Sequence, residues 1–195
     1  MLLAISLYRL PDFVRGPMTN PFFHDIGMSK DVIGAARATI GLASTFLGIA
    51  AGGFLSLRLG YMRALILGGI LQATGIALHA LLTISGPNVP LFMSIMAFDD
   101  FSISIAGITL VAYMSSLTSL GYTATQYALL SSTYAWAGKV LKGFSGAIVE
   151  SLSAHVGLME AYAVFFVGAG LIGVPAVLLF LLLDSRQRAA HMTTE

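Results

Sequence analysis

Residues 90–115 read PLFMSIMAFDDFSISIAGITLVAYMS, an apolar stretch interrupted by the adjacent acids Asp99 and Asp100. About 20 apolar residues suffice for a helix to cross the hydrocarbon core of a bilayer. An ionised carboxylate in the middle of such a helix costs about 2.5–3.5 kcal/mol on insertion scales, so both acids are expected to face a polar cleft and not lipid. The stretch therefore predicts a transmembrane helix that contributes to an internal polar site.

Apolar segments of similar length lie on both sides of this stretch. The six predicted spans cover residues 2–23, 31–57, 64–84, 90–115, 124–150 and 158–183. Turn-forming sequences such as RLGYMR and SGPNVP separate them. The predicted fold class is all-α: a polytopic membrane protein with six transmembrane helices in a single bundle over residues 1–195, in which residues 184–195 form a cytoplasmic tail.

The composition supports a chain whose solvent is lipid. Of its 195 residues, 57% are hydrophobic and only 10% are charged, whereas a soluble domain carries about 25% charged residues. The mean hydropathy is +0.87. A net charge of +1 without a basic cluster gives no sign of nucleic-acid binding, and the absence of cysteine excludes disulfides and thiolate metal sites. We expect a lipid bilayer as the partner, and neither a cofactor nor a metal.

The arginines outside the spans predict the orientation in the membrane. Arg58 and Arg63 lie between the second and third spans, and Arg186 and Arg188 follow the sixth, which places all four on one side. The opposite side offers only Lys30. Because loops rich in lysine and arginine stay in the cytoplasm, both termini are expected to be cytoplasmic.

Charged residues inside the spans are the candidates for a functional site, because such residues are usually buried, paired and functional. Adjacent helical residues point about 100° apart. One aspartate is therefore expected to make an ion pair or a water-bridged contact with Lys139, Lys142 or Arg9, while the other faces the cavity or a neighbouring helix. For Arg15 and Arg37 a structural role and a functional role both stay open, and His79 is interpreted as a packing residue. The expected substrate and proton pathway comprises Tyr8, Arg9, Asp12, Asp99, Asp100, Gln126, Lys139 and Lys142.

A carboxylate of this set is a candidate proton carrier. Burial and a neighbouring negative charge both favour the protonated form of an acid. We expect Asp99, Asp100 or Asp12 to alternate between protonated and ionised states during a transport cycle. The alternative, a static ion pair that only holds helices together, stays open.

Residues 52–63, GGFLSLRLGYMR, resemble the loop signature G-x-x-x-D-R-x-G-x-x-R of the major facilitator superfamily. Gly53, Arg58, Gly60 and Arg63 match the signature, and Leu57 stands where it has aspartate. The resemblance implies that the arginines hydrogen-bond helix ends on the cytoplasmic side and that Gly60 permits a tight turn.

Three other stretches resemble the AmpG-type muropeptide permeases of this superfamily: LYRLPDF at 7–13, SLGYTATQYALLSS at 119–132 and GKVLKGFSGAIVE at 138–150. Pro11 is a departure, since a glycine is associated with its place. The resemblance runs over nearly the whole chain but covers only the second half of a twelve-helix permease. It implies an inverted pair of three-helix repeats, a partner that supplies the first six helices, and proton-driven import of anhydromuropeptides, which are anionic sugar-peptides, across the bacterial inner membrane.

Several alternatives stay open from the sequence. The chain could be an orphaned or split-gene half without transport of its own, a homodimer, or a transporter for another substrate. An enzyme is not expected. Residues 143–146, GFSG, match the G-x-S-G of rhomboid proteases, but the sixth span contains no histidine to act as the base for Ser145.

Overall fold

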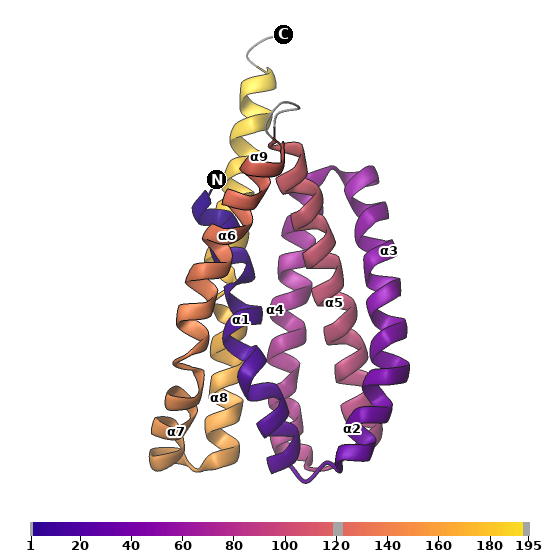
Figure 1. Ribbon diagram of the computed structural model, residues 1–195, viewed down its shortest axis with the longest axis vertical. Helices are drawn as coiled ribbons and strands as arrows, with labels where there is room; N and C mark the ends of the chain where they lie inside the picture. The colour runs from indigo at the N-terminus through magenta and orange to yellow at the C-terminus, as the bar shows by residue number, and fades with distance from the viewer. Residues whose placement is uncertain (1, 119–122, 193–195) are drawn as a thin grey trace.

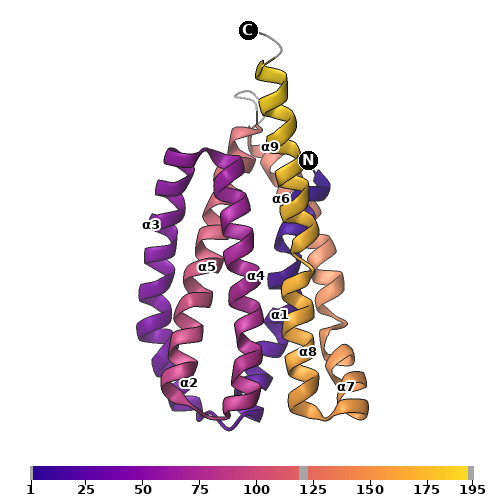
Figure 2. The ribbon, with the colours of Figure 1, turned by 180° about the vertical axis from the view of Figure 1, so that it is seen from behind.

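The computed structural model describes residues 2–118 and 123–192, and their regular structure is helical throughout (Figures 1 and 2). The π-helical turn η1 joins α2 to α3 in one continuous rod. The helices are α1 (Leu2–Asp25), α2 (Lys30–Ala36), η1 (Arg37–Gly41), α3 (Leu42–Leu59), α4 (Tyr61–Ser85), α5 (Val89–Ser116), α6 (Thr123–Lys142), α7 (Ser145–Val156), α8 (Leu158–Leu171) and α9 (Val174–Met192).

The chain is an all-α polytopic membrane protein, as predicted. Among the described residues, four helical segments are long and apolar enough to cross a membrane: Lys30–Leu59, Tyr61–Ser85, Val89–Ser116 and Leu158–Ser185. The predicted spans at 2–23 and 124–150 are also helical and lie alongside the others (Figure 1), but their hydropathy is lower. The total of six spans stays a prediction.

Two predicted spans are broken in the structure. The helix expected over 124–150 is interrupted at Gly143 and Phe144, and the one expected over 158–183 is interrupted at Ile172 and Gly173. The second break has a local cause. Pro175 lies in the first turn of α9, where its missing N–H is tolerated, and its ring disfavours continuation from the preceding helix.

The connection between α3 and α4 is a single residue. Gly60 adopts φ +80° there, a backbone conformation that favours glycine, so the predicted tight turn is confirmed. The role expected for the arginines beside it is not seen. Within the described part of the chain neither Arg58 nor Arg63 hydrogen-bonds a helix end; the Arg58 guanidinium instead lies 5.3 Å from the ring centroid of Phe54. Residues 119–122, the first four of the SLGYTATQYALLSS stretch, lie outside the described residues.

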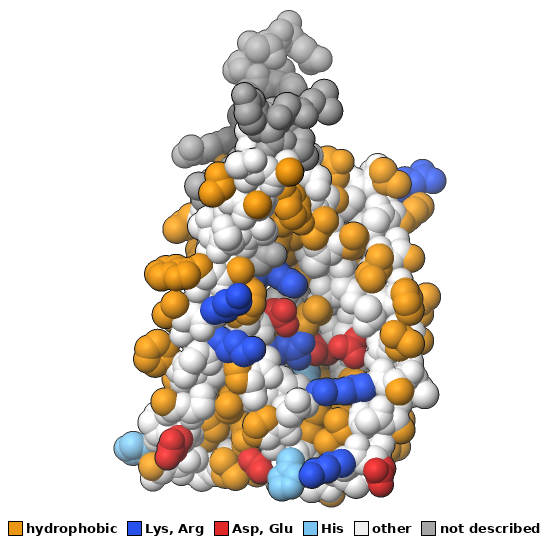
Figure 3. All heavy atoms as spheres, in the orientation of Figure 1, with side chains coloured by type: hydrophobic (Ala, Val, Ile, Leu, Met, Phe, Trp, Pro, Cys, Tyr) orange, Lys and Arg blue, Asp and Glu red, His pale blue; other side chains and the backbone are white. Residues whose placement is uncertain are grey.

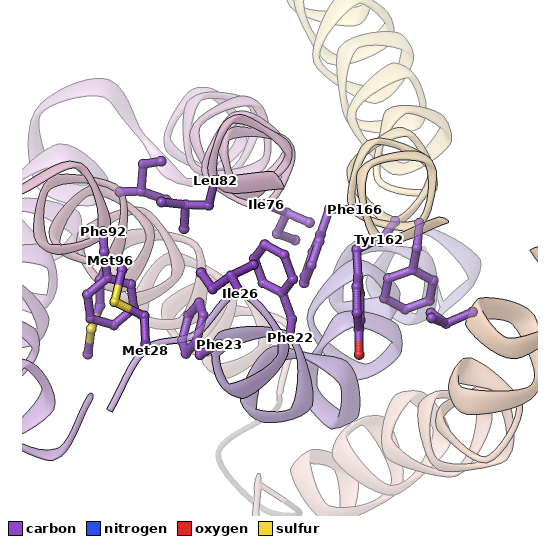
Figure 4. Close-up of a cluster of buried hydrophobic side chains, with 14 of the residues drawn as sticks. Phe22, Phe23, Ile26, Met28, Ile76, Leu82, Phe92, Met96, Tyr162 and Phe166 are labelled. Carbon is purple, nitrogen blue, oxygen red and sulfur yellow. The ribbon is translucent and has the colours of Figure 1, made fainter. Parts of the chain in front are cut away.

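Two buried apolar clusters hold the helices together, and α1 contributes to both. The first contains Phe22 and Phe23 of α1 with Phe92 and Phe166 (Figure 4). The second includes Tyr8. The segment of α1 between the clusters carries the charged side chains, so the fold places these charges midway along the bundle.

The second span packs closely on α5. A Cβ atom at Gly48 would collide with the backbone carbonyl of Phe101, and one at Gly52 would collide with Ile108. Only glycine lets the two helix backbones approach this closely. The contact fixes α3 against the helix that carries Asp99 and Asp100.

Both chain ends lie at the same end of the bundle, together with the α3–α4 turn (Figure 1). Arg58 and Arg63 flank this turn, and Lys30 lies at the opposite end, where α2 begins. The relative placement agrees with the sequence analysis. The assignment of this end to the cytoplasm stays a prediction.

Candidate functional site

A polar cavity of about 410 Å³ lies between the charged segment of α1 and the helices α3, α4 and α5. Its volume falls in the range of small-molecule sites in proteins. The wall combines cationic, anionic, hydroxyl and aromatic side chains from four helices and η1. The lining residues are Arg15, Gly16, Thr19, Phe23, Arg37, Gly41, Leu42, Thr45, His79, Met96, Asp99 and Asp100.

The strongest interaction at the cavity is an ion pair between Arg15 of α1 and Asp99 of α5. The Nη1 atom of Arg15 donates to Oδ2 of Asp99 at 2.5 Å. Both residues are buried, with 8% and 3% of their surfaces exposed. Because removing either charge would leave the other unpaired away from water, the two side chains depend on each other.

This ion pair continues along α1 as a chain of alternating charges. Asp12 Oδ1 lies 3.5 Å from Nη2 of Arg15, and Asp12 Oδ2 lies 3.7 Å from Nη1 of Arg9. The spacing of three residues puts all three side chains on one side of the helix. Arg15 is thus held between two carboxylates, of which Asp12 is the more exposed.

Neither partner of the buried pair uses its full hydrogen-bonding capacity. Nε of Arg15 and Oδ1 of Asp99 are buried, and neither has a hydrogen-bond partner among the described residues. A buried polar atom without a hydrogen bond costs stability, and in a native protein it often has a functional role. Arg15 thus has an N–H donor to offer a ligand, and Asp99 has an oxygen that can accept a hydrogen bond or a proton.

Asp100 of α5 lines the cavity and lies against η1. A Cβ atom at Gly41 would lie 2.8 Å from Oδ2 of Asp100 and 3.1 Å from Cε of Met96, so a side chain at position 41 would displace the carboxylate. π-Helical turns within α-helices occur frequently at functional sites. Here the turn brings the backbone of the second span close to Asp100.

Arg37 lies at the start of the same π-helical turn and reaches across to α1. Its Nη2 atom donates to Oδ1 of Asn20 at 2.5 Å, and the residue as a whole is exposed. Arg15 and Arg37 had no settled role from the sequence. The structure places both on the cavity wall, where they supply its guanidinium groups.

His79 of α4 is the residue of the cavity that sequence reasoning missed. It packs between the rings of Phe23 and Phe166, as the packing interpretation expected, but it also lines the cavity. Gly75, one turn earlier on α4, lies against Asp99, because a Cβ atom there would be 3.1 Å from Oδ1. The sequence alone does not show this contact, because it depends on how the helices pack.

The ion-pair partner of Asp99 is not one of the three cations that the sequence predicted. Within the described residues Asp99 pairs with Arg15, and no ion pair joins either aspartate to Lys139, Lys142 or Arg9. The two lysines are exposed on α6, which packs mainly on α1. The depth of a charge in its span predicted that it would pair, but the choice of partner depends on the packing of the helices.

Of the eight predicted pathway residues, Asp99 and Asp100 line the cavity and the other six lie outside its lining. Tyr8 is buried in the second apolar cluster and donates a hydrogen bond to the backbone oxygen of Leu65 at 2.9 Å. Gln126 is half-buried on α6. Charged side chains nevertheless gather across the middle of one face of the bundle, over α1, α6 and the helices beside them (Figure 3).

Ser145, the serine of the GFSG segment, makes a structural contact. Its side chain is fully buried and donates to the backbone oxygen of Val14 at 2.7 Å. This bond joins the start of α7 to α1 at the break after α6. The hydroxyl serves a helix–helix contact in this structure.

Curated proteins similar to this chain are transporters. This chain is 31% identical over 183 residues to the anhydromuropeptide permease of Escherichia coli K12. The alignment covers 93% of this chain and 35% of the permease. The chain is 26% identical over 186 residues to the putative transporter AmpG 4 of Rickettsia felis, covering 95% and 43%. It is 24% identical over 153 residues to the putative transporter AmpG 3 of Rickettsia typhi, covering 78% and 36%.

No protein-family model matches the chain. The chain spans less than half the length of the curated relatives it matches, while the alignments to most of them cover nearly all of it. The similarity thus runs through every helix that contributes to the cavity. Over nearly its whole length this chain is similar to putative AmpG transporters and to an anhydromuropeptide permease, and it spans about two fifths of their length.

Proposed function

We propose that this chain is one six-helix half of a twelve-helix permease that imports anhydromuropeptides across the bacterial inner membrane, driven by the proton gradient. The observation that carries the proposal is the polar cavity midway along the bundle, with the buried Arg15–Asp99 pair on its wall. Intramembrane charges of this kind mark substrate and ion pathways in transporters. The relatives described above supply the substrate class.

The packing of the helices supports an inverted repeat of three spans each. The second span (α2, η1 and α3) packs mainly on the fourth (α5), and the fifth (α6 and α7) packs mainly on the first (α1). The third span (α4) packs on the sixth (α8 and α9). A two-fold axis that exchanges spans one to three with spans four to six would produce this pattern, which is the arrangement of such transporter halves.

The charges of the site suit an anionic sugar-peptide. Arg15 and Arg37 offer guanidinium groups, which can bind a carboxylate through bidentate hydrogen bonds. Thr19, Thr45 and Asp100 offer partners for sugar hydroxyls. A substrate carboxylate that bound Arg15 would compete with Asp99 for the same guanidinium, which would link substrate binding to the charge state of Asp99.

A second six-helix half is the proposed partner. Lys139 and Lys142 are exposed on α6, and their exposure to lipid would be costly. A facing half would cover these lysines and close the cavity on its open side. Two copies of this chain could supply both walls in its place, since the inverted repeat does not forbid a homodimer.

Uptake of labelled anhydromuropeptide tests this proposal. In a host without its own permease, cells that express this chain together with the first six helices of an AmpG-type permease are expected to accumulate the label. Cells with either part alone are expected to show background uptake. Saturable uptake by this chain alone, as a monomer, would contradict the half-permease proposal. Absence of uptake in the combination, with both parts present in the membrane, would favour an orphaned half or a different substrate.

A further inference from the structure

His79 is held so that only the edge of its ring is available to the cavity. The ring lies between Phe23, at 5.8 Å and 19°, and Phe166, at 5.1 Å and 24°, so aromatic rings are stacked against it from α1 and α8. Only 1% of the residue's surface is exposed, and it lines the cavity. Stacking of this kind leaves in-plane hydrogen bonding as the chemistry that the ring can offer.

One ring nitrogen is already engaged. Nδ1 of His79 lies 3.1 Å from the backbone oxygen of Gly75, a contact in which the nitrogen must donate. This bond assigns the neutral ring to the Nδ1–H tautomer and leaves Nε2 as a proton acceptor. Protonation at Nε2 would keep the Gly75 bond intact, so the ring can change charge without changing its position.

The charges around His79 come from several neighbouring helices. Asp99 of α5 lies against Gly75, one turn from His79. Arg15 of α1 neutralises Asp99 through the ion pair, and a carboxylate without such a partner would favour a protonated imidazole near it. Asp100 of α5 and Arg37 of η1 line the same cavity. The charge of His79 thus depends on whether Arg15 is bound to Asp99.

We propose that His79 and Asp99 form a proton-binding pair that takes up one proton at Nε2 of His79 when Arg15 leaves Asp99 for an anionic ligand. Withdrawal of Arg15 leaves the buried Asp99 carboxylate without its cationic partner. A positively charged imidazolium at His79 would then neutralise the carboxylate. Release of the ligand returns Arg15 to Asp99 and expels the proton. The role in transport rests on the proposed function, but the uptake of the proton by this pair is a property of the chain itself.

Nuclear magnetic resonance of the His79 ring nitrogens tests the pair without any substrate. In a protein with His24, His155 and His191 replaced by Gln, the ¹⁵N signals of the remaining ring distinguish the neutral tautomers from the imidazolium. At about pH 6.5, near the unperturbed midpoint of histidine, the ring is expected to be neutral with Arg15 present. It is expected to be imidazolium in Arg15→Gln, and neutral again in Arg15→Gln with Asp99→Asn.

A second variant keeps the test decisive if Arg15→Gln does not fold. Asp99→Asn keeps the size of the side chain, and on acidification its His79 should become imidazolium only at a lower pH than in the parent. A neutral ring in Arg15→Gln would place the proton on Asp99 and would overturn the proposal, as would identical titrations in the parent and in Asp99→Asn. The uptake assay can fail while these signals behave as expected, so a wrong substrate assignment and a wrong proton site are distinguishable.

Discussion

Replacement of Arg15 by Met is expected to lower the free energy of unfolding by about 3–5 kcal/mol, because the buried Asp99 carboxylate would lose the guanidinium that pairs with it. The side chain of Met fills much of the same space, so the loss would come from charge more than from packing. Equilibrium unfolding of the purified chain in mild detergent, followed by circular dichroism or by fluorescence of Trp136, measures the effect.

The matched controls separate the ion pair from general effects of removing an arginine. Arg58→Met removes an exposed guanidinium that stacks on Phe54, and it is expected to cost less than about 1 kcal/mol. Arg15→Met with Asp99→Leu removes both charges, and it should recover most of the stability lost in the single variant. Equal losses in Arg15→Met and Arg58→Met would contradict the role assigned to the buried pair.

The substitution Asp99→Asn is expected to abolish accumulation of anhydromuropeptide against its gradient in a complete transporter that contains this half. Asn preserves size and much of the hydrogen bonding to Arg15, but it carries no negative charge that could pair with Arg15 or with a protonated His79. Exchange of substrate down its gradient should therefore persist. Proton-driven uptake and counterflow, measured in the same vesicles, distinguish these two activities.

The other carboxylates provide the comparison for this variant. Asp12→Asn and Asp100→Asn alter the more exposed partners of the site, so smaller losses of accumulation are expected. Asp31→Asn lies in the first turn of α2, outside the cavity, and should have no effect. If Asp12, Asp99 and Asp100 can each be replaced by Asn with normal accumulation, the carboxylates are structural and coupling to the proton gradient lies elsewhere in the transporter.

The sequence predicted the features that depend on local chemistry. The apolar lengths predicted where the spans at 31–57, 64–84 and 90–115 lie, and the structure places them within a few residues of those limits. Gly60 predicted the tight turn between the second and third spans, where it adopts a positive φ. Each of these follows from a few neighbouring residues.

The features that the sequence did not predict depend on which helices meet. Arg15 becomes the partner of Asp99 because α1 and α5 face each other across the cavity, a relation between residues 84 positions apart. His79 joins the site because Gly75 brings α4 against Asp99. The sequence did not predict the breaks at Gly143 and Gly173. The length of an apolar segment predicts a span, but it does not show whether the helix within that span is continuous.

Protection of a cysteine in the cavity tests most directly whether this site binds anhydromuropeptide. The chain has no cysteine, so Thr45→Cys on the cavity wall and Asp31→Cys outside it each provide a single thiol. The rate of modification by a water-soluble maleimide is measured for the chain assembled with the first six helices of an AmpG-type permease. Anhydromuropeptide is expected to slow modification of Thr45→Cys severalfold and to leave Asp31→Cys unchanged. Equal rates at Thr45→Cys with and without a saturating concentration of anhydromuropeptide would contradict the assignment of the cavity as the transport site.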